Sequence, residues 1–200
     1  MAKLYFKYGV MGSSKSAHAL LAKFNYEEKG SSVWLIKPFS SPGDDGFVRS
    51  VVGLEAKAEI ISRTDDLYEN FITGTHRTTD VIIADECQFF TEDQIDALRR
   101  IVDEHDIPVL CYGLRTDFLT RLFPGSRRLL ELADSIAEIK TVCRCGHKAT
   151  VNARIDSKGD IVTVGDQVFV GGGDSYDSMC YRCWKDKIKS QQERKNKENA

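Results

Sequence analysis

The stretch Leu4-Tyr-Phe-Lys-Tyr-Gly-Val-Met-Gly-Ser-Ser-Lys-Ser16 decides the fold class of this chain. It begins with a β-rich run and passes through a Gly/Ser loop into residues 15–28, where apolar side chains recur at helical spacing. Such a strand-loop-helix turn points successive backbone N–H groups and the helix dipole at one phosphate group. The stretch therefore predicts a phosphate-binding loop at the start of an α/β domain.

The loop departs at one position from the usual pattern of Gly, four residues and Gly-Lys-Ser/Thr. Gly9, Lys15 and Ser16 match it, whereas Ser14 stands where the second glycine is usual. A serine there costs on the order of 1 kcal/mol if the position needs positive φ. We expect Lys15 to neutralise the β- and γ-phosphates of a bound nucleotide and Ser16 to hold Mg²⁺. The residues expected to surround the phosphates are Gly9, Val10, Met11, Gly12, Ser13, Ser14, Lys15 and Ser16.

The first two-thirds of the chain alternates short β-rich runs with helical patterns. We expect strands near residues 4–8, 33–36, 58–62, 81–84, 108–112 and 135–140, and helices near 15–28, 65–72, 91–105 and 129–133. Thr91 and Gln94 have the spacing of a capping box. Strands separated by helices indicate a P-loop NTPase-like parallel sheet with helices on both faces.

An apolar run, Val81-Ile-Ile-Ala, ends in the carboxylates Asp85 and Glu86. In P-loop enzymes an aspartate at this place binds the metal ion. Glu86 would lie at the mouth of the sheet, where a carboxylate can take a proton from an attacking hydroxyl or water. The alternative is that either residue only caps the following turn.

Four cysteines mark a change of character after residue 141. Cys143 and Cys145 form one pair and Cys180 and Cys183 another, and two such pairs can hold Zn²⁺ tetrahedrally. His147 could substitute for Cys143 or Cys145. We therefore divide the chain into a nucleotide-binding domain (1–141), a small β-rich zinc domain (142–186) and a polar tail (187–200).

Composition narrows the class of protein further. The 200 residues are 42% hydrophobic and 29% charged, which is ordinary globular usage and argues against a disordered chain. A net charge of −2 does not suit a general nucleic-acid clamp, and we expect neither a nucleic-acid nor a membrane partner. The N-terminus lacks a secretory signal pattern. We expect a cytoplasmic protein, in which the six cysteines are ligands or core residues, the latter for Cys87 and Cys111.

Taken in order, these motifs resemble the type II, cytosolic and zinc-containing, thymidine kinases. The resemblance runs from about Leu4 to Trp184 and includes Asp85-Glu-Cys-Gln-Phe-Phe90, Gly113-Leu-Arg-Thr-Asp-Phe118 and Gly171-Gly-Gly-Asp-Ser-Tyr176. It implies transfer of the γ-phosphate of ATP to the 5′-hydroxyl of thymidine, and also of deoxyuridine. By the same resemblance Glu86 is the general base, Asp85 binds Mg²⁺, and Asp44 or Asp45 is a further acidic residue of the site.

The resemblance also implies how the nucleoside is held. Backbone groups of a zinc-domain loop, Phe169 to Gly171, would bind the thymine base, and the zinc would support both ends of that loop. The substrate-binding residues expected on this ground are Met11, Gln88, Phe89, Leu114, Phe118, Phe123, Asn152, Phe169, Val170, Gly171 and Tyr176. The family further implies a homotetramer inhibited by dTTP.

Two readings from other classes remain open on the sequence. One is a P-loop ATPase with a nucleic-acid-binding zinc ribbon, motivated by the six basic and three acidic residues from Lys185 to Ala200. The other is an inactive nucleotide-binding module, motivated by Ser14. Turnover that requires a nucleoside acceptor would separate both from a kinase.

Overall fold

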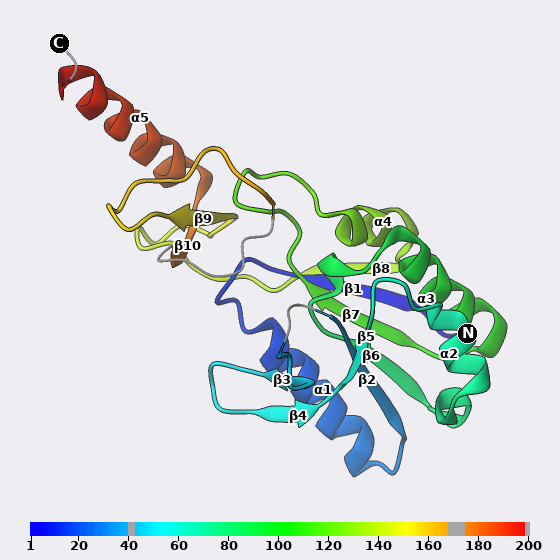
Figure 1. Ribbon diagram of the computed structural model, residues 1–200. Helices are drawn as coiled ribbons and strands as arrows, with labels where there is room; N and C mark the ends of the chain where they lie inside the picture. The colour runs from blue at the N-terminus through cyan, green and yellow to red at the C-terminus, as the bar shows by residue number, and fades with distance from the viewer. Residues whose placement is uncertain (40–42, 168–174, 199–200) are drawn as a thin grey trace.

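The computed structural model describes residues 1–39, 43–167 and 175–198 and is dominated by a six-stranded parallel sheet (Figure 1). Every neighbouring pair in this sheet is parallel. In spatial order the strands are β5 (Glu59–Ile61), β2 (Val33–Pro38), β6 (Val81–Ala84), β7 (Val109–Gly113), β1 (Leu4–Tyr8) and β8 (Ser135–Glu138). The predicted parallel sheet is confirmed.

Helices cover both faces of the sheet, as the sequence predicts. Helix α1 (Lys15–Glu28) packs on one face, together with a small antiparallel hairpin of β3 (Phe47–Arg49) and β4 (Glu55–Lys57). The opposite face carries α2 (Leu67–Thr73), α3 (Glu92–His105) and α4 (Pro124–Leu132) (Figure 1). Two short 3-10 helices, η1 (Thr75–Thr78) and η2 (Cys87–Phe89), flank β6. Because the central strands are covered on both sides, β6 and β7 are buried throughout.

The register of the sheet brings two distant motifs to one edge. Phe6 of β1 and Ala84 of β6 are both level with Cys111 of β7, the strand between them. Since all three strands are parallel, the loop after β1 and the acidic pair after β6 emerge at the same carboxyl edge. The fold thus places the phosphate-loop sequence beside Asp85 and Glu86.

Helix α4 and the β3–β4 hairpin differ from the sequence prediction. Helix α4 begins at Pro124, ahead of the predicted start at residue 129, with proline at its first turn, where the missing N–H is not needed. The β3–β4 hairpin is not predicted, because its three-residue strands are too short for a periodic pattern and Val51 and Val52 at its turn are exposed. The capping box of Thr91 and Gln94 at the start of α3 is confirmed.

The cysteine-containing region forms a smaller group of elements beyond the sheet (Figure 1). Strands β9 (Val151–Ile155) and β10 (Ser175–Met179) pair antiparallel, and helix α5 (Tyr181–Glu198) follows (Figure 1). Gln191 of α5 is buried and hydrogen-bonds both the N–H and the carbonyl of Ile161. Helix α5 therefore packs on the region around residue 161 through Gln191. Its polar sequence predicts only a solvated helix, without this contact.

Among the helices that the structure describes, each is too short or too polar to cross a lipid bilayer.

Candidate active site

The phosphate loop turns sharply between β1 and α1. Gly12 and Ser14 both adopt left-handed backbone conformations, with φ of 72° and 64°. Ser14 thus carries the strain that the sequence suggests, on the order of 1 kcal/mol relative to glycine. Gly9 is required for another reason, since a Cβ there would lie 2.5 Å from the carbonyl oxygen of Ile139. The loop has the strand-to-helix geometry that presents backbone N–H groups to a phosphate.

Lys15 lies inside this loop and is only 8% exposed. Its ammonium group donates a 3.0 Å hydrogen bond to the carbonyl of Val10. Burial lowers the pKa of Lys15, while attraction to the carboxylates of Glu86 and Asp85 opposes that shift. The lysine therefore shares one electrostatic environment with both carboxylates, although they are far away in sequence.

Asp85 stands directly after β6 and is 3% exposed. Burial, and secondly repulsion from Glu86, raises its pKa to about 6, whereas a hydrogen bond from the Ser16 hydroxyl lowers it. Within the described residues the buried Oδ1 of Asp85 has no hydrogen-bond partner. A hydroxyl paired with a carboxylate that keeps one oxygen free is a donor set suited to Mg²⁺. The predicted metal-binding residues Ser16 and Asp85 are thus brought together.

Glu86 is held in an unusual backbone conformation, with φ of 53°, where the chain turns from β6 into η2. Its Oε2 accepts a 2.5 Å hydrogen bond from Nε2 of Gln88, which is 1% exposed. The Oε1 of Gln88 in turn accepts a 2.9 Å bond from the N–H of Leu114. Glycine at position 113 allows this approach, because a Cβ there would lie 2.5 Å from that Oε1. The carboxylate of Glu86 is thereby oriented through Gln88, which is itself held by the backbone of Leu114 directly after β7.

A cavity of about 530 Å³ has Gln88, the hydrogen-bond partner of Glu86, in its wall. Its size suits a ligand such as a nucleoside. Phe89 and Phe123 meet edge to face in its wall with ring centroids 5.5 Å apart. The predicted substrate-binding residues that line it are Met11, Gln88, Phe89, Leu114, Phe118, Phe123, Asn152 and Tyr176. The other three, Phe169, Val170 and Gly171, lie outside the described residues.

Asn152 lines this cavity, but both ends of its amide are bound to backbone groups. Its Oδ1 accepts a 2.7 Å hydrogen bond from the N–H of Met11, and its Nδ2 donates a 2.8 Å bond to the carbonyl of Thr116. The side chain is 2% exposed. The sequence analysis predicts that this amide hydrogen-bonds the edge of a pyrimidine. In the structure both of its ends bind backbone groups of the protein instead.

Asp117 and Gln167 are among the lining residues that the sequence did not predict. Asp117 accepts hydrogen bonds from the N–H groups of Leu119 and Arg121, and Gln167 donates a 3.0 Å bond to its Oδ2. Asp117 stands within the Gly113–Phe118 run and could have been found there. Gln167 carries no pattern that marks it.

The aspartates after β2 have different surroundings. The side chain of Asp44 is 4% exposed and forms a 2.9 Å ion pair with Lys37 of β2. Lys37 follows Ile36, whose carbonyl accepts a hydrogen bond from the N–H of Asp85. Asp45 is exposed and paired with Arg49. Of the two candidates, Asp44 is therefore the one tied to the edge of the sheet that carries Asp85.

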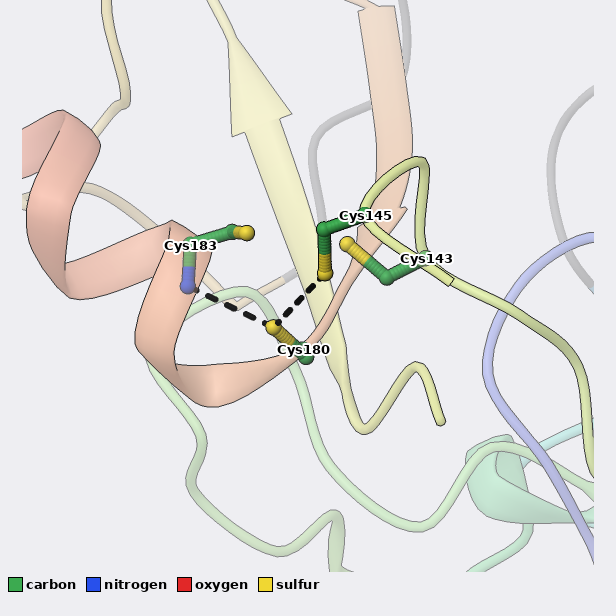
Figure 2. Close-up of side chains that lie close together, drawn as sticks. All are labelled: Cys143, Cys145, Cys180 and Cys183. Carbon is green, nitrogen blue, oxygen red and sulfur yellow. Dashed lines mark hydrogen bonds between the residues drawn. The ribbon is translucent and has the colours of Figure 1, made fainter. Parts of the chain in front are cut away.

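The four predicted zinc ligands form one cluster (Figure 2), and among the described residues theirs is the group that meets the geometry for a metal ion. The Sγ atoms of Cys143, Cys145, Cys180 and Cys183 all lie within 4.8 Å of one another. Cys145 and Cys180 are 3.6 Å apart, close to the about 3.8 Å expected for two thiolates on a tetrahedral zinc. His147 lies outside the group, with Nδ1 3.4 Å from Sγ of Cys145.

The backbone prepares one of these cysteines for metal binding. N–H groups of Cys145 and Cys180 donate to Cys143 and lower the pKa of its thiol to about 6, which favours the thiolate that zinc requires. Gly146, with φ of 85°, closes the turn after the first pair. Cys87 and Cys111, expected in the core, are fully buried there.

A family model and individual relatives both match this chain over nearly its whole length. The family model described as thymidine kinase matches residues 2–184. A thymidine kinase of Mesorhizobium japonicum is 43% identical over 190 residues, covering 94% of this chain and 93% of its own. The thymidine kinase of Yersinia pseudotuberculosis is 43% identical over 196 residues, covering 95% of this chain and 98% of its own. That of Shewanella oneidensis is 42% identical over 194 residues, covering 94% of this chain and 99% of its own.

One solved structure gives a weaker match. The ATPase DotB of Legionella pneumophila aligns over 74% of this chain and 43% of its own, with 18% identity and a TM-score of 0.38. The family assignment therefore rests on the sequence relatives.

Proposed function

This chain belongs to the thymidine kinase family, and on that premise we propose that it transfers the γ-phosphoryl group of ATP to the 5′-hydroxyl of thymidine, giving dTMP and ADP. The observation that carries the proposal is the placement of Glu86. This carboxylate shares the surroundings of Lys15 and Asp85 on one side and is bound to Gln88, a wall residue of the nucleoside-sized cavity, on the other. It stands where the two substrates would meet.

The reaction needs one proton transfer and one phosphoryl transfer. Glu86 accepts the proton of the 5′-hydroxyl as the oxygen attacks the γ-phosphorus. The new O–P bond forms while the bond from phosphorus to the bridging oxygen breaks, and ADP leaves with that electron pair. Lys15 and the backbone N–H groups of the phosphate loop neutralise charge on the transferring group. Mg²⁺ bound with ATP supplies further charge neutralisation, and Ser16 and Asp85 are the residues that would hold it.

Thymidine would occupy the cavity beside Glu86. Phe89 and Phe123 offer apolar surface to the base, and the backbone of Phe169 to Gly171 is proposed to bind its polar edge. Deoxyuridine lacks only one methyl group, worth about 1 kcal/mol in a fitted pocket, so we include it as a second substrate.

The cysteine cluster is assigned a structural role. A closed set of four thiolates binds zinc without leaving a position for chemistry. We propose that residues 1–141 bind the nucleotide and that residues 142–186 form the zinc domain, which supports the nucleoside loop. Helix α5 (Tyr181–Glu198) runs across the proposed boundary at residue 186.

Regulation and assembly follow as finer proposals. dTTP combines the thymine of one substrate with the triphosphate of the other, which suits inhibition at this site. Exposed apolar side chains at Leu21 and Phe24 of α1 and at Ile136 of the edge strand β8 are compatible with a homotetramer. The free cysteines suit a reducing cytoplasm.

Release of ADP from MgATP, measured with and without thymidine, tests the proposed reaction. Turnover that depends on thymidine supports it and shows that Ser14 is compatible with catalysis. Turnover stimulated by DNA or RNA instead would favour the nucleic-acid-dependent ATPase. ATP binding without turnover would favour the inactive module.

A further inference from the structure

Met11 of the phosphate loop is bound by the zinc domain on both sides of its backbone. Its N–H donates to Oδ1 of Asn152 at 2.7 Å. Its carbonyl accepts a hydrogen bond from the hydroxyl of Ser178. The loop that faces the nucleotide is therefore attached to strands β9 and β10, more than a hundred residues away in the chain.

The two side chains that make these bonds form one unit. Asn152 and Ser178 are directly opposite each other in the register of the β9–β10 pair. Side chains of directly opposed residues point to the same face of a sheet. The backbone N–H and carbonyl of Met11 are thus bound by an acceptor and a donor that two paired strands hold at a fixed spacing.

The zinc cluster lies at the end of this pair of strands. Cys180 follows Met179, the last residue of β10, and Met179 is paired with Val151 beside Asn152. Asn152 also holds the carbonyl of Thr116, in the loop that carries Leu114 of the cavity wall. One hairpin therefore connects the metal cluster, the phosphate loop and the wall of the nucleoside cavity.

We propose that Asn152 and Ser178 are positioning residues that hold the phosphate loop in its nucleotide-binding conformation. The inference rests on the proposed function for its place in catalysis, but nucleotide binding itself requires no turnover. Ser14, three residues after Met11, is held in a left-handed conformation, which a free chain disfavours at any residue other than glycine. Bonds from outside the loop select that conformation, so their loss reduces the fraction of molecules competent to bind phosphate.

Ser178→Ala tests this most cleanly, because Ser178 is only half-buried and alanine leaves no strain. We expect the Kd for MgADP, measured by calorimetry on the zinc-loaded protein, to rise about fivefold, the ratio that corresponds to one neutral hydrogen bond. Ser178→Thr keeps a hydroxyl on a strand-compatible residue and should restore the affinity. The KM for ATP should rise with the Kd, while the KM for thymidine changes less than twofold.

Ser190→Ala is the matched control. Ser190 lies in α5, and its hydroxyl also donates to a backbone carbonyl, that of Asp186, without contacting the phosphate loop. It should leave the Kd for MgADP unchanged. The proposal is overturned if Ser178→Ala binds MgADP like the wild type, if threonine fails to restore binding, or if affinity for both substrates falls together with the unfolding midpoint. Absence of thymidine turnover in a wild type that binds MgADP would reject the proposed function instead.

Discussion

Asp85→Asn should stabilise the nucleotide-free protein while impairing catalysis. The carboxylate is almost fully buried, one of its oxygens has no hydrogen-bond partner among the described residues, and Glu86 repels it. Asparagine has nearly the same shape and carries no charge. Replacing Asp85 therefore removes the cost of an ionised group that the fold keeps for metal binding.

The size of the effect follows from the pKa of Asp85. Its value in the folded protein is raised to about 6 from 3.8, so the folded state binds the proton more tightly than the unfolded state does. Ionised Asp85 therefore destabilises the fold by up to about 3 kcal/mol, and the penalty grows as pH rises from 3.8 through the folded-state pKa. By the same relation the penalty is about 2 kcal/mol at about pH 5 and about 3 kcal/mol at about pH 8.

Urea denaturation of wild type and Asp85→Asn at these two pH values measures the difference. Both proteins carry the same zinc cluster, so its own pH dependence cancels. The variant should be more stable than the wild type at both pH values, and its advantage should grow by about 1 kcal/mol between them. An advantage that is constant with pH, or that shrinks as pH rises, would refute the assignment of a buried, destabilised carboxylate. Thymidine-dependent turnover should fall sharply in the same variant.

Two further perturbations follow from the site. Lys15→Ala should reduce kcat/KM at least about a hundredfold with the fold intact, because the ammonium group that neutralises the phosphates is removed. Steady-state kinetics, together with a thermal melt, checks this prediction. Near-normal rates would contradict it. Removing zinc with a chelator should raise the KM for thymidine before the parallel sheet unfolds. Trp34 is buried in β2, so its fluorescence in a Trp184→Phe background reports on the sheet separately. An unchanged KM for thymidine in the zinc-free protein would reject the supporting role of the metal.

The parts of the fold that could be predicted from sequence are those set by local chemistry. Their conformation is determined by the identity of a few neighbouring residues. Examples are the Gly9-to-Ser16 turn, the capping box at Thr91 and the buried run before Asp85. The two cysteine pairs come together as predicted, because their spacing is typical of a site that holds one metal ion with four thiolates.

What could not be predicted depends on contacts between distant segments. The role of Asn152 is defined by Met11 and Thr116, which no pattern around residue 152 indicates. Helix α4 starts at Pro124 because Gly125 can approach the carbonyls of Cys87 and Phe90, where a Cβ would come within 2.6 Å and 2.7 Å. That requirement arises from packing against η2 and leaves no periodic signal.

The most direct test of the central claim is the thymidine-dependent turnover of Glu86→Gln. Glutamine keeps the size of the side chain and can still meet Gln88 through its amide, but it cannot accept the proton of the 5′-hydroxyl. We predict that kcat falls by about 10²- to 10⁴-fold, the usual contribution of a general base, while the Kd values for MgADP and thymidine stay within a few-fold of the wild type. A variant that binds both ligands and turns over at near-normal rate would show that Glu86 is not the base.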